Sequence, residues 1–204
     1  YKKLDENLPI RPPVMCAGCP HRGLFYTLTK NKVTVLGDIG CYTLGSVAPL
    51  SAMDVTLCMG ASFSGIHGWN KAGGADNEKK TVAVIGDSTF THSGMTGLLD
   101  CCVDNANVTI IILDNEITGM TGSQKSSATG RIESICTGMG VAPEHIRVIK
   151  PLKANHEENV RILKEEIGYK GVSVVIPRRE CIVAMNKRLK AERAAKEKAA
   201  KENK

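Results

Sequence analysis

Residues 81–88 read TVAVIGDS and residues 108–115 read VTIIILDN, and these two stretches decide the fold. Each one is a continuous apolar run that ends in acidic and polar residues. Continuous runs of this length are typical of strands buried on both faces of a parallel sheet. The 25 residues between GDS and DN are enough for one crossover helix and a returning strand. We therefore expect two neighbouring parallel strands whose carboxyl ends carry Asp87 and Asn115.

The rest of the chain alternates strand-like and helix-like stretches around this pair. Further strands are predicted at residues 33–38, 146–150 and 172–177, and helices at residues 22–30, 61–71, 94–105 and 156–167. This alternation predicts an α/β fold of three layers, with a mainly parallel sheet and helices on both faces. In such folds ligands bind beyond the carboxyl ends of the strands, so the loops there are the candidates for function.

Composition and charge exclude several classes of protein. Hydrophobic residues make up 42% of the 204 residues and charged residues 24%, which is the balance of a folded globular chain. No stretch approaches the roughly 20 apolar residues of a membrane span, and the N-terminus has no apolar signal core. We therefore expect a cytoplasmic protein with no membrane partner. The net charge of +6 is concentrated in residues 187–204, so no nucleic-acid partner is expected for the folded part.

Three segments are predicted along the chain. Residues 1–13 are polar, end in Arg-Pro-Pro and are predicted to be an extended N-terminal segment. Residues 14–185 hold the strands and helices of the folded domain. Residues 186–204 are rich in Ala, Lys and Glu without an apolar stripe, so they are predicted to form a solvated basic helical tail or linker.

The polar residues at the two strand ends predict a metal and phosphate site. A carboxylate at Asp87 and an amide oxygen at Asn115 are the hard oxygen ligands that Mg²⁺ prefers beside phosphates. Gly86 lets the backbone approach an anion closely. Either turn alone is common between strands and helices, but the two together on consecutive strands favour the site. Backbone N–H groups and a hydroxyl for phosphate oxygens are offered by Gly119, Thr121 and Gly122.

The pattern G-D-S, 25 residues, D-N resembles the thiamine-diphosphate-binding motif, which is usually G-D-G, a similar interval and N-N. The resemblance implies that Mg²⁺ is bound by Asp87, the side chain of Asn115 and the main-chain carbonyl of Ile117, and that the metal holds the diphosphate. Ser88 replaces the last Gly of the motif and Asp114 its first Asn. The cofactor site implied by the resemblance comprises Cys58, Met59, Gly60, Gly86, Asp87, Ser88, Asn115, Ile117, Gly119, Met120, Thr121 and Gly122.

Eight cysteines in a chain without a secretion signal favour metal ligands or catalytic groups over disulfides. Cys16 and Cys19 form a C-x-x-C pair in a loop, whereas Cys41 and Cys181 each follow a predicted strand. Four such thiolates would satisfy either one Zn²⁺ ion or a cubane iron–sulfur cluster. The other four are expected to pack as small apolar side chains, with Cys58 also a candidate for the wall of the thiamine pocket; they are Cys58, Cys101, Cys102 and Cys136.

The cysteine motifs resemble those of the 2-oxoacid:ferredoxin oxidoreductases. Residues 16–23 (CAGCPHRG) and 37–45 (GDIGCYTLG) look most like the thiamine domain of the indolepyruvate:ferredoxin oxidoreductase alpha subunit. Residues 58–62 (CMGAS) and 118–124 (TGMTGSQ) agree with it, so that the resemblance covers roughly residues 10–185. It implies a thiamine-diphosphate-binding fold and a [4Fe–4S] cluster near the cofactor, bound by Cys16, Cys19, Cys41 and Cys181.

The resemblance also implies an activity. The chain would be the thiamine-binding part of an enzyme that oxidatively decarboxylates an aryl 2-oxoacid, such as indolepyruvate, to acyl-CoA and CO₂. Electrons would pass through the cluster to ferredoxin. The implied partners are coenzyme A, a pyrimidine-binding domain or chain, a ferredoxin-like domain and a beta subunit. The Glu that activates the cofactor is expected from a missing domain, so no catalytic residue is predicted here and the chain alone is expected to show little turnover.

Two other functions remain open at this point. A non-oxidative thiamine-dependent 2-oxoacid decarboxylase half would share Asp87 and Asn115 but would need no cluster, and the four cysteines argue against it. A zinc-stabilised binding module would need no catalysis, and the two-strand magnesium motif argues against it. The identity of the bound metal separates all three hypotheses.

The histidines give weaker signals. His21 and Arg22 adjoin the cysteine loop, where a role in shaping the substrate or cluster surroundings and a surface or capping role are equally reasonable. Packing or capping is favoured for His67. For His92, which closely follows the diphosphate turn, a place in the pocket is weighed against packing.

Overall fold

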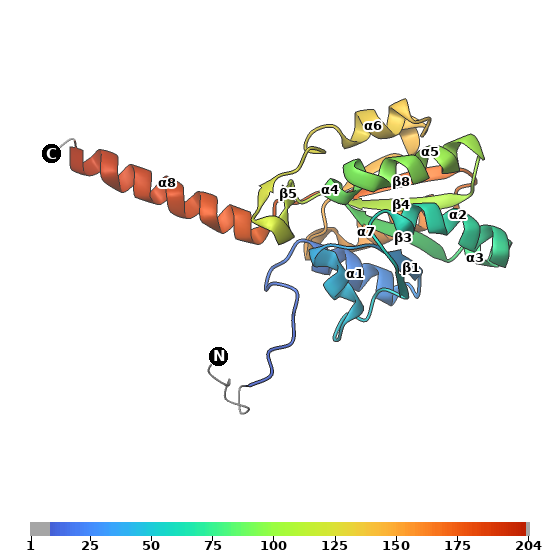
Figure 1. Ribbon diagram of the computed structural model, residues 1–204, viewed down its shortest axis with the longest axis horizontal. Coiled ribbons are helices and arrows are strands. Elements are labelled where there is room, and N and C mark those ends of the chain that lie inside the picture. Colours follow the sequence, from blue (N-terminus) through green and yellow to red (C-terminus); the bar gives the residue numbers. More distant parts are fainter. Residues whose placement is uncertain (1–8, 203–204) are drawn as a thin grey trace, which may run out of the picture.

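Six strands form one parallel sheet in the computed structural model, which describes residues 9–202 (Figure 1). The strand order is β2-β1-β3-β4-β8-β7, and every pairing within this sheet is parallel. The strands are β1 (Thr34–Gly37), β2 (Val55–Thr56), β3 (Thr81–Gly86), β4 (Val108–Leu113), β7 (Ile146–Ile149) and β8 (Val172–Pro177). Because Gly86 pairs with Leu113, the residues that follow β3 and β4 emerge at the same edge of the sheet.

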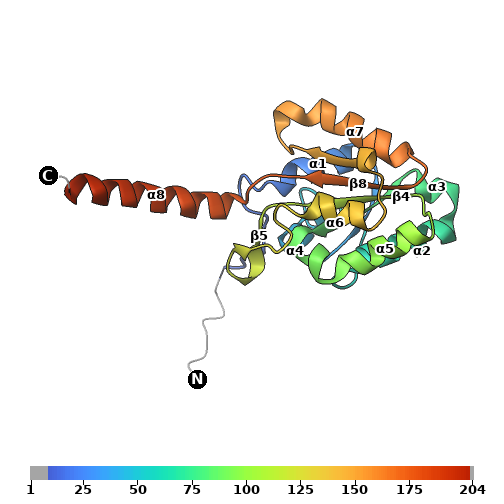
Figure 2. The ribbon, with the colours of Figure 1, turned by 90° about the horizontal axis from the view of Figure 1, so that it is seen from above.

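Helices cover both faces of the sheet, as Figures 1 and 2 show. The helices α1 and α7 lie on one face, and α2, α5 and α6 lie on the other. The α-helices are α1 (His21–Lys30), α2 (Ala61–Gly73), α3 (Ala75–Glu78), α4 (Asp87–Thr89), α5 (Met95–Val103), α6 (Ile132–Gly138), α7 (His156–Gly168) and α8 (Ile182–Glu202). The predicted three-layer α/β fold is therefore confirmed.

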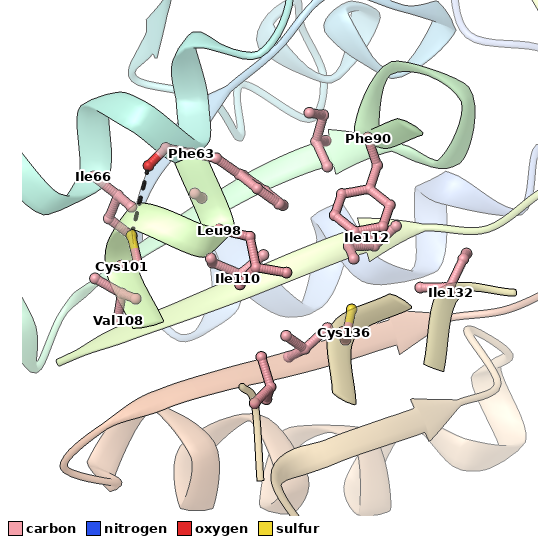
Figure 3. Packing of buried hydrophobic residues seen from close by; sticks show 14 of the residues in the cluster. Phe63, Ile66, Phe90, Leu98, Cys101, Val108, Ile110, Ile112, Ile132 and Cys136 are labelled. Atoms are coloured by element: carbon pink, nitrogen blue, oxygen red, sulfur yellow. Dashed lines mark hydrogen bonds between the residues drawn. The ribbon is translucent and has the colours of Figure 1, made fainter. Parts of the chain in front are cut away.

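Two apolar cores separate these layers, because alternate residues of each buried strand point to opposite faces. Ile85 and Ile110 pack beneath α2 and α5, whereas Val84 and Ile111 pack beneath α1 and α7. Figure 3 shows the first core, in which the rings of Phe63 and Phe90 lie 6.1 Å apart. Both faces of β3 and β4 are therefore buried, which explains their uninterrupted apolar sequences.

Four cysteines were expected to pack as small apolar side chains, and the structure shows how far each is buried. Cys101 and Cys136 are buried, and the Cys101 thiol donates to the carbonyl of Phe63 (Figure 3). Cys102 is half-buried. Cys58 is exposed, so the expectation that it packs in the core was wrong for this residue. The reason is local, since residues 57–59 form an exposed loop between β2 and α2.

The helix predicted at residues 94–105 begins earlier than expected. The segment after β3 is helical from Asp87, with α4 and α5 joined by a π-helical turn, η2 (Phe90–Gly94). A Cβ atom on Gly97 would lie only 2.8 Å from the backbone N of Ser64, so α5 packs very closely against α2. Turns of the π type inside helices occur frequently at functional sites.

Several elements were not predicted from the sequence. Besides β2 and α6, they include the hairpin of β5 (Ile117–Thr118) with β6 (Gln124–Lys125), which is antiparallel. The remaining short helical turns are η1 (Cys41–Ser46), η3 (Gly119–Thr121), η4 (Pro143–His145) and η5 (Lys153–Asn155). The sequence signals for these elements are weak, because each element has few residues.

The basic C-terminal segment forms the long helix α8, which projects away from the sheet (Figures 1 and 2). Its basic residues are exposed, and Arg188 pairs with Glu180 and Glu192. Residues 9–13 are irregular and exposed, while residues 1–8 of the predicted N-terminal segment and residues 203–204 of the tail lie outside the described residues. Within the described part of the chain, no helix has the length and apolar character needed to cross a membrane.

Candidate functional site

A cavity of about 240 Å³ lies beyond the carboxyl ends of β1, β3 and β4. The sequence-predicted residues that line it are Met59, Gly86, Asp87, Ser88, Asn115, Ile117, Gly119, Met120 and Thr121. Three predicted cofactor residues are absent from the lining, namely Cys58, Gly60 and Gly122. Sequence reasoning gave no site role to other lining residues, which are Ile39, Gly40, Tyr42, Thr89, Leu113 and Thr118. It had predicted Cys41, which also lines the cavity, as a cluster ligand, and it had left His21 and His92 open.

Asp87 is the first residue after β3, and its carboxylate is only partly satisfied. Oδ1 accepts a hydrogen bond from the backbone N–H of Ser88 at 2.8 Å. Oδ2 is buried and has no hydrogen-bond partner among the described residues. Burial raises the pKa of Asp87 to about 7, and the nearby carboxylate of Asp114 adds to the rise. A buried, unpartnered carboxylate oxygen is costly on its own, so a cation at this position would stabilise it.

The side chain of Asn115 is held in one orientation. Its Nδ2 donates to Nε2 of His21 at 3.2 Å, and its Oδ1 accepts from the backbone N–H of Ile117 at 3.2 Å. Burial lowers the pKa of His21 to about 4, so the ring is neutral at pH 7, and Nε2 accepts from Nδ2 in the tautomer that carries its proton on Nδ1. An amide oxygen can accept twice, and Asn115 Oδ1 therefore keeps one lone pair for a metal ion.

A hydroxyl pair joins the two loops that follow β3 and β4. Thr118 Oγ1 donates to Ser88 Oγ at 2.9 Å. Both residues line the cavity. Ser88, which replaces the last glycine of the G-D-G motif, thus accepts a hydrogen bond that glycine could not accept. The loops after β3 and β4 are therefore linked by side chains as well as by the sheet.

The aromatic ring of Tyr42 forms part of the cavity wall. Its hydroxyl donates to the carbonyl of Ile39 at 3.1 Å, and its ring meets the His21 ring edge-on with 6.2 Å between centroids. A Cβ on Gly86 would lie 2.7 Å from this ring, and a Cβ on Gly40 would also collide with it. Both glycines are therefore required by the close approach of Tyr42.

Asp38 organises the loop before α2, although sequence reasoning gave it no role. Its buried carboxylate accepts from the backbone N–H of Gly60 at 2.9 Å and from the hydroxyl of Ser62 at 2.9 Å. Gly60 has a φ of 89°, and a Cβ there would lie 2.7 Å from the carbonyl oxygen of Ser93. Gly60 therefore serves the close approach of this loop to the π-helical turn and does not line the cavity.

The four cysteines of the predicted cluster come together from three separate segments of the chain. Burial raises the pKa of the Cys19 thiol, and the neighbouring thiols of the other three cysteines raise it further. Burial likewise raises the pKa of the Cys41 thiol, followed by the effects of Cys181 and Cys16. Cys41 also lines the cavity. Nevertheless, no three His, Cys, Asp or Glu side chains between residues 9 and 202 are arranged to share a single metal ion.

Arg178 holds the segment that leads from β8 to Cys181. Its Nε donates to Oδ2 of the buried Asp114 at 2.6 Å, and both terminal nitrogens donate to Glu133 at 2.8 Å. These contacts hold the pKa of Glu133 below its usual range. The backbone N–H of Cys181 then donates to the carbonyl of Asn115 at 3.2 Å. The aspartate that replaces the first Asn of the motif is therefore part of an ion pair.

Arg22, His67 and His92 have three different surroundings in the structure. Arg22 donates from Nε to the carbonyl of Cys16 at 2.9 Å and from its guanidinium to the carbonyl of Met15, so it caps the cysteine loop. His67 contacts Asp104 at 2.9 Å, away from the cavity, in agreement with a structural role. His92 is exposed and lines the cavity, from the π-helical turn.

Comparison with known proteins gives the class to which this site belongs. Residues 38–177 match the family model of the thiamine pyrophosphate enzymes, described as their C-terminal TPP binding domain. The matched region is most of the chain, and the chain therefore belongs to this family of thiamine diphosphate-binding domains.

Within that class, the sequence is similar to one particular subunit. It is 40% identical over 199 residues to the indolepyruvate oxidoreductase subunit IorA of Archaeoglobus fulgidus, covering 89% of this chain and 30% of the relative. It is 37% identical over 204 residues to subunit IorA of Pyrococcus horikoshii, covering 89% of this chain and 31% of the relative. The chain thus spans less than a third of the length of these relatives.

Solved structures show the same fold. A 2-oxoglutarate:ferredoxin oxidoreductase from Magnetococcus marinus superposes with a TM-score of 0.65 and 16% identity, covering 86% of this chain and 69% of that one. Benzoylformate decarboxylase from Polynucleobacter necessarius superposes with a TM-score of 0.53 and 17% identity, covering 88% and 35%. At these identities the superpositions establish the fold alone.

Proposed function

We propose that this chain is the thiamine diphosphate- and Mg²⁺-binding part of an oxidoreductase that acts on an aryl 2-oxoacid such as indolepyruvate. The observation that carries the proposal is the unpartnered, buried Oδ2 of Asp87 beside the oriented amide of Asn115 in one cavity. The similarity to the IorA subunits supports the substrate class, because those relatives are named indolepyruvate oxidoreductases.

The donor atoms at this site fit Mg²⁺. Oδ2 of Asp87, Oδ1 of Asn115 and the carbonyl of Ile117 are all oxygens, and Mg²⁺ prefers such ligands together with phosphate. Gly86, Ser88, Gly119 and Thr121 would surround the diphosphate. The thiazolium of bound thiamine diphosphate would supply the carbanion chemistry for decarboxylation, whereas this chain binds and orients the cofactor. Tyr42 and the buried strand ends exclude water from the inner wall.

Four thiols can bind either one Zn²⁺ ion or a [4Fe–4S] cluster. The resemblance of the cysteine motifs to those of the 2-oxoacid:ferredoxin oxidoreductases favours the cluster, and no three such side chains in the described residues are arranged to share one ion. We therefore propose Cys16, Cys19, Cys41 and Cys181 as ligands of a cluster that carries electrons to ferredoxin.

Other chains or domains would complete the active site. Among the described residues, no glutamate lines the cavity, so the Glu that activates the cofactor would come from a pyrimidine-binding domain or chain. A beta subunit, a ferredoxin-like domain, coenzyme A and ferredoxin are the further proposed partners. The short span of this chain relative to the IorA subunits is consistent with such partners. All eight cysteines are free thiols, which suits a reducing cytoplasmic location.

The test is metal and cofactor analysis of the protein purified without oxygen. We expect iron and acid-labile sulfide in equal amounts, both lost in Cys16→Ser and Cys181→Ser, with the half-buried Cys102→Ser as the matched control that keeps them. Thiamine diphosphate should bind only with Mg²⁺, and Asp87→Ala should abolish that binding. Stoichiometric zinc would favour the zinc-stabilised module. Mg²⁺-dependent cofactor binding without iron, even after reconstitution, would favour a non-oxidative decarboxylase half.

A further inference from the structure

His21 lies between the cysteine loop and the magnesium motif. It follows Cys19 by two residues and is the first residue of α1, so the cysteine loop leads directly into it. Its side chain accepts a hydrogen bond from Nδ2 of Asn115 at 3.2 Å. Both His21 and Asn115 are buried, with exposed fractions of 4% and 8%. A direct bond between buried side chains holds both of them in place more firmly than one at the surface.

The contacts with His21 and Ile117 together favour one orientation of the Asn115 amide. With Nδ2 on His21, Oδ1 accepts from the backbone of Ile117 and keeps a lone pair for a cation. In the reversed orientation Nδ2 would face the N–H of Ile117, donor against donor, and Nε2 of His21 would have to carry the ring proton to meet Oδ1. Removal of the Nε2 acceptor would leave Nδ2 buried without a partner, and only the N–H of Ile117 would then hold the amide.

Other contacts surround the same loop. The backbone N–H of Cys181 donates to the carbonyl of Asn115 at 3.2 Å. The sulfur of Cys41 lies against Gly119, 3.0 Å from where a Cβ would stand. These contacts hold the backbone of the loop that follows β4, but neither sets the rotation of the Asn115 amide. Only His21 and Ile117 contact that amide among the hydrogen bonds of the described residues.

We propose that His21 is a positioning residue, which aims the amide oxygen of Asn115 at the bound Mg²⁺ and ties that orientation to the cysteine loop. The proposal rests on the proposed function, since it takes Asn115 as a magnesium ligand. Hydrogen-bonded partners of metal ligands typically contribute about 10–100-fold to metal affinity. His21 would do so through Asn115 and not as a metal ligand itself.

The test uses the full chain together with the partner chains or domains with which it is isolated. The Mg²⁺ concentration for half-saturation is measured by calorimetry at saturating thiamine diphosphate. We expect His21→Leu to raise it about 10-fold or more. His21→Gln, whose Oε1 can accept from Nδ2 in place of the imidazole nitrogen, should stay within about threefold of the wild type.

The matched control is Thr27→Val in the same helix. Thr27 is buried, and its hydroxyl contacts Gly23 and His156 away from the cavity. This variant should lower the melting temperature without changing the Mg²⁺ half-saturation. If Thr27→Val weakens Mg²⁺ as much as His21→Leu, or if His21→Leu binds like the wild type, His21 has no positioning role.

Binding of Mg²⁺ and thiamine diphosphate by the wild-type protein tests the proposed function separately from the role of His21. If the wild-type protein shows no joint binding of Mg²⁺ and thiamine diphosphate, that function is wrong and the role of His21 is refuted with it. If the wild type binds both and folded His21→Gln fails to restore affinity, only the positioning role is refuted.

Discussion

Thr118 Oγ1 lies 2.9 Å from Ser88 Oγ and donates to it, which joins the loop after β4 to the loop after β3 across the wall of the cavity. Ser88 belongs to the first half of the thiamine diphosphate motif, and Thr118 follows its second half by three residues. The pairing of β3 with β4 already holds the starts of the two loops together. The bond between the two hydroxyls holds together residues further along these loops. Its effect can be measured separately from the sheet.

Ser88→Gly, which restores the usual motif residue, should loosen this contact. We expect a loss of about 0.5–1.5 kcal/mol in the free energy of unfolding. Thr118→Val should cost a similar amount, and the double variant should cost little more than either single one because both remove the same bond. Urea unfolding of the three variants measures this. Fully additive losses would show that the two hydroxyls act independently.

Asp87 makes stability depend on pH in the absence of metal. Its pKa is raised by burial from 3.8 to about 7, so the folded chain binds this proton more tightly than the unfolded chain. The favourable contribution is therefore complete below about pH 4 and is lost as the pH rises through about 7. Asp87→Asn should remove this dependence and stabilise the chain at pH 8 by an amount on the order of a few kcal/mol.

The measurement is urea unfolding at pH 5 and pH 8 with a metal chelator present. Added Mg²⁺ should stabilise the wild type at pH 8, where Asp87 is ionised, and should have little effect on Asp87→Asn. The same change between pH 5 and pH 8 in both proteins would contradict the role given to Asp87.

Arg178→Ala should destabilise the chain by removing the partner of a buried carboxylate. Asp114 is 2% exposed, and the arginine that pairs with it also binds Glu133. Breaking a buried pair costs about 3–5 kcal/mol, and because Arg178 is itself 31% exposed we expect about 2–3 kcal/mol. The control is Arg188→Ala, whose ion pairs are exposed and should matter little. Equal losses of unfolding free energy in the two variants would show that the Asp114–Arg178 pair contributes no more to stability than an exposed ion pair.

Gly97→Ala tests the close packing of α5 against α2. The added Cβ would lie 2.8 Å from the backbone N of Ser64, and backbone cannot rotate away as a side chain can. We expect a loss of about 1–3 kcal/mol by thermal or urea unfolding. Gly68→Ala in α2 is the control, because nothing lies within 4 Å of its added Cβ. That variant should be neutral or more stable by up to about 1 kcal/mol, as alanine favours helices.

Much of the fold was predictable because its signals are local. The uninterrupted apolar run of β4 follows directly from burial on both faces, and the alternation of strands and helices predicted the layers. The π-helical turn and the two-residue strands β2, β5 and β6 were not predicted. Each is too short to show a period, and the π-helical turn is in addition packed closely against Gly60 through Ser93.

The sequence by itself determined the order of the strands along the chain, the carboxylate and the amide at the two strand ends (Asp87 and Asn115), and the four spaced cysteines. Only the tertiary structure decided that Asp87 keeps an unpartnered oxygen, that the side chains of His21 and Asn115 meet, and that Arg178 pairs with Asp114. The physical reason is distance along the chain. A pattern of residue types records burial and turns, whereas a hydrogen bond between residues 94 positions apart exists only after the sheet has brought their segments together.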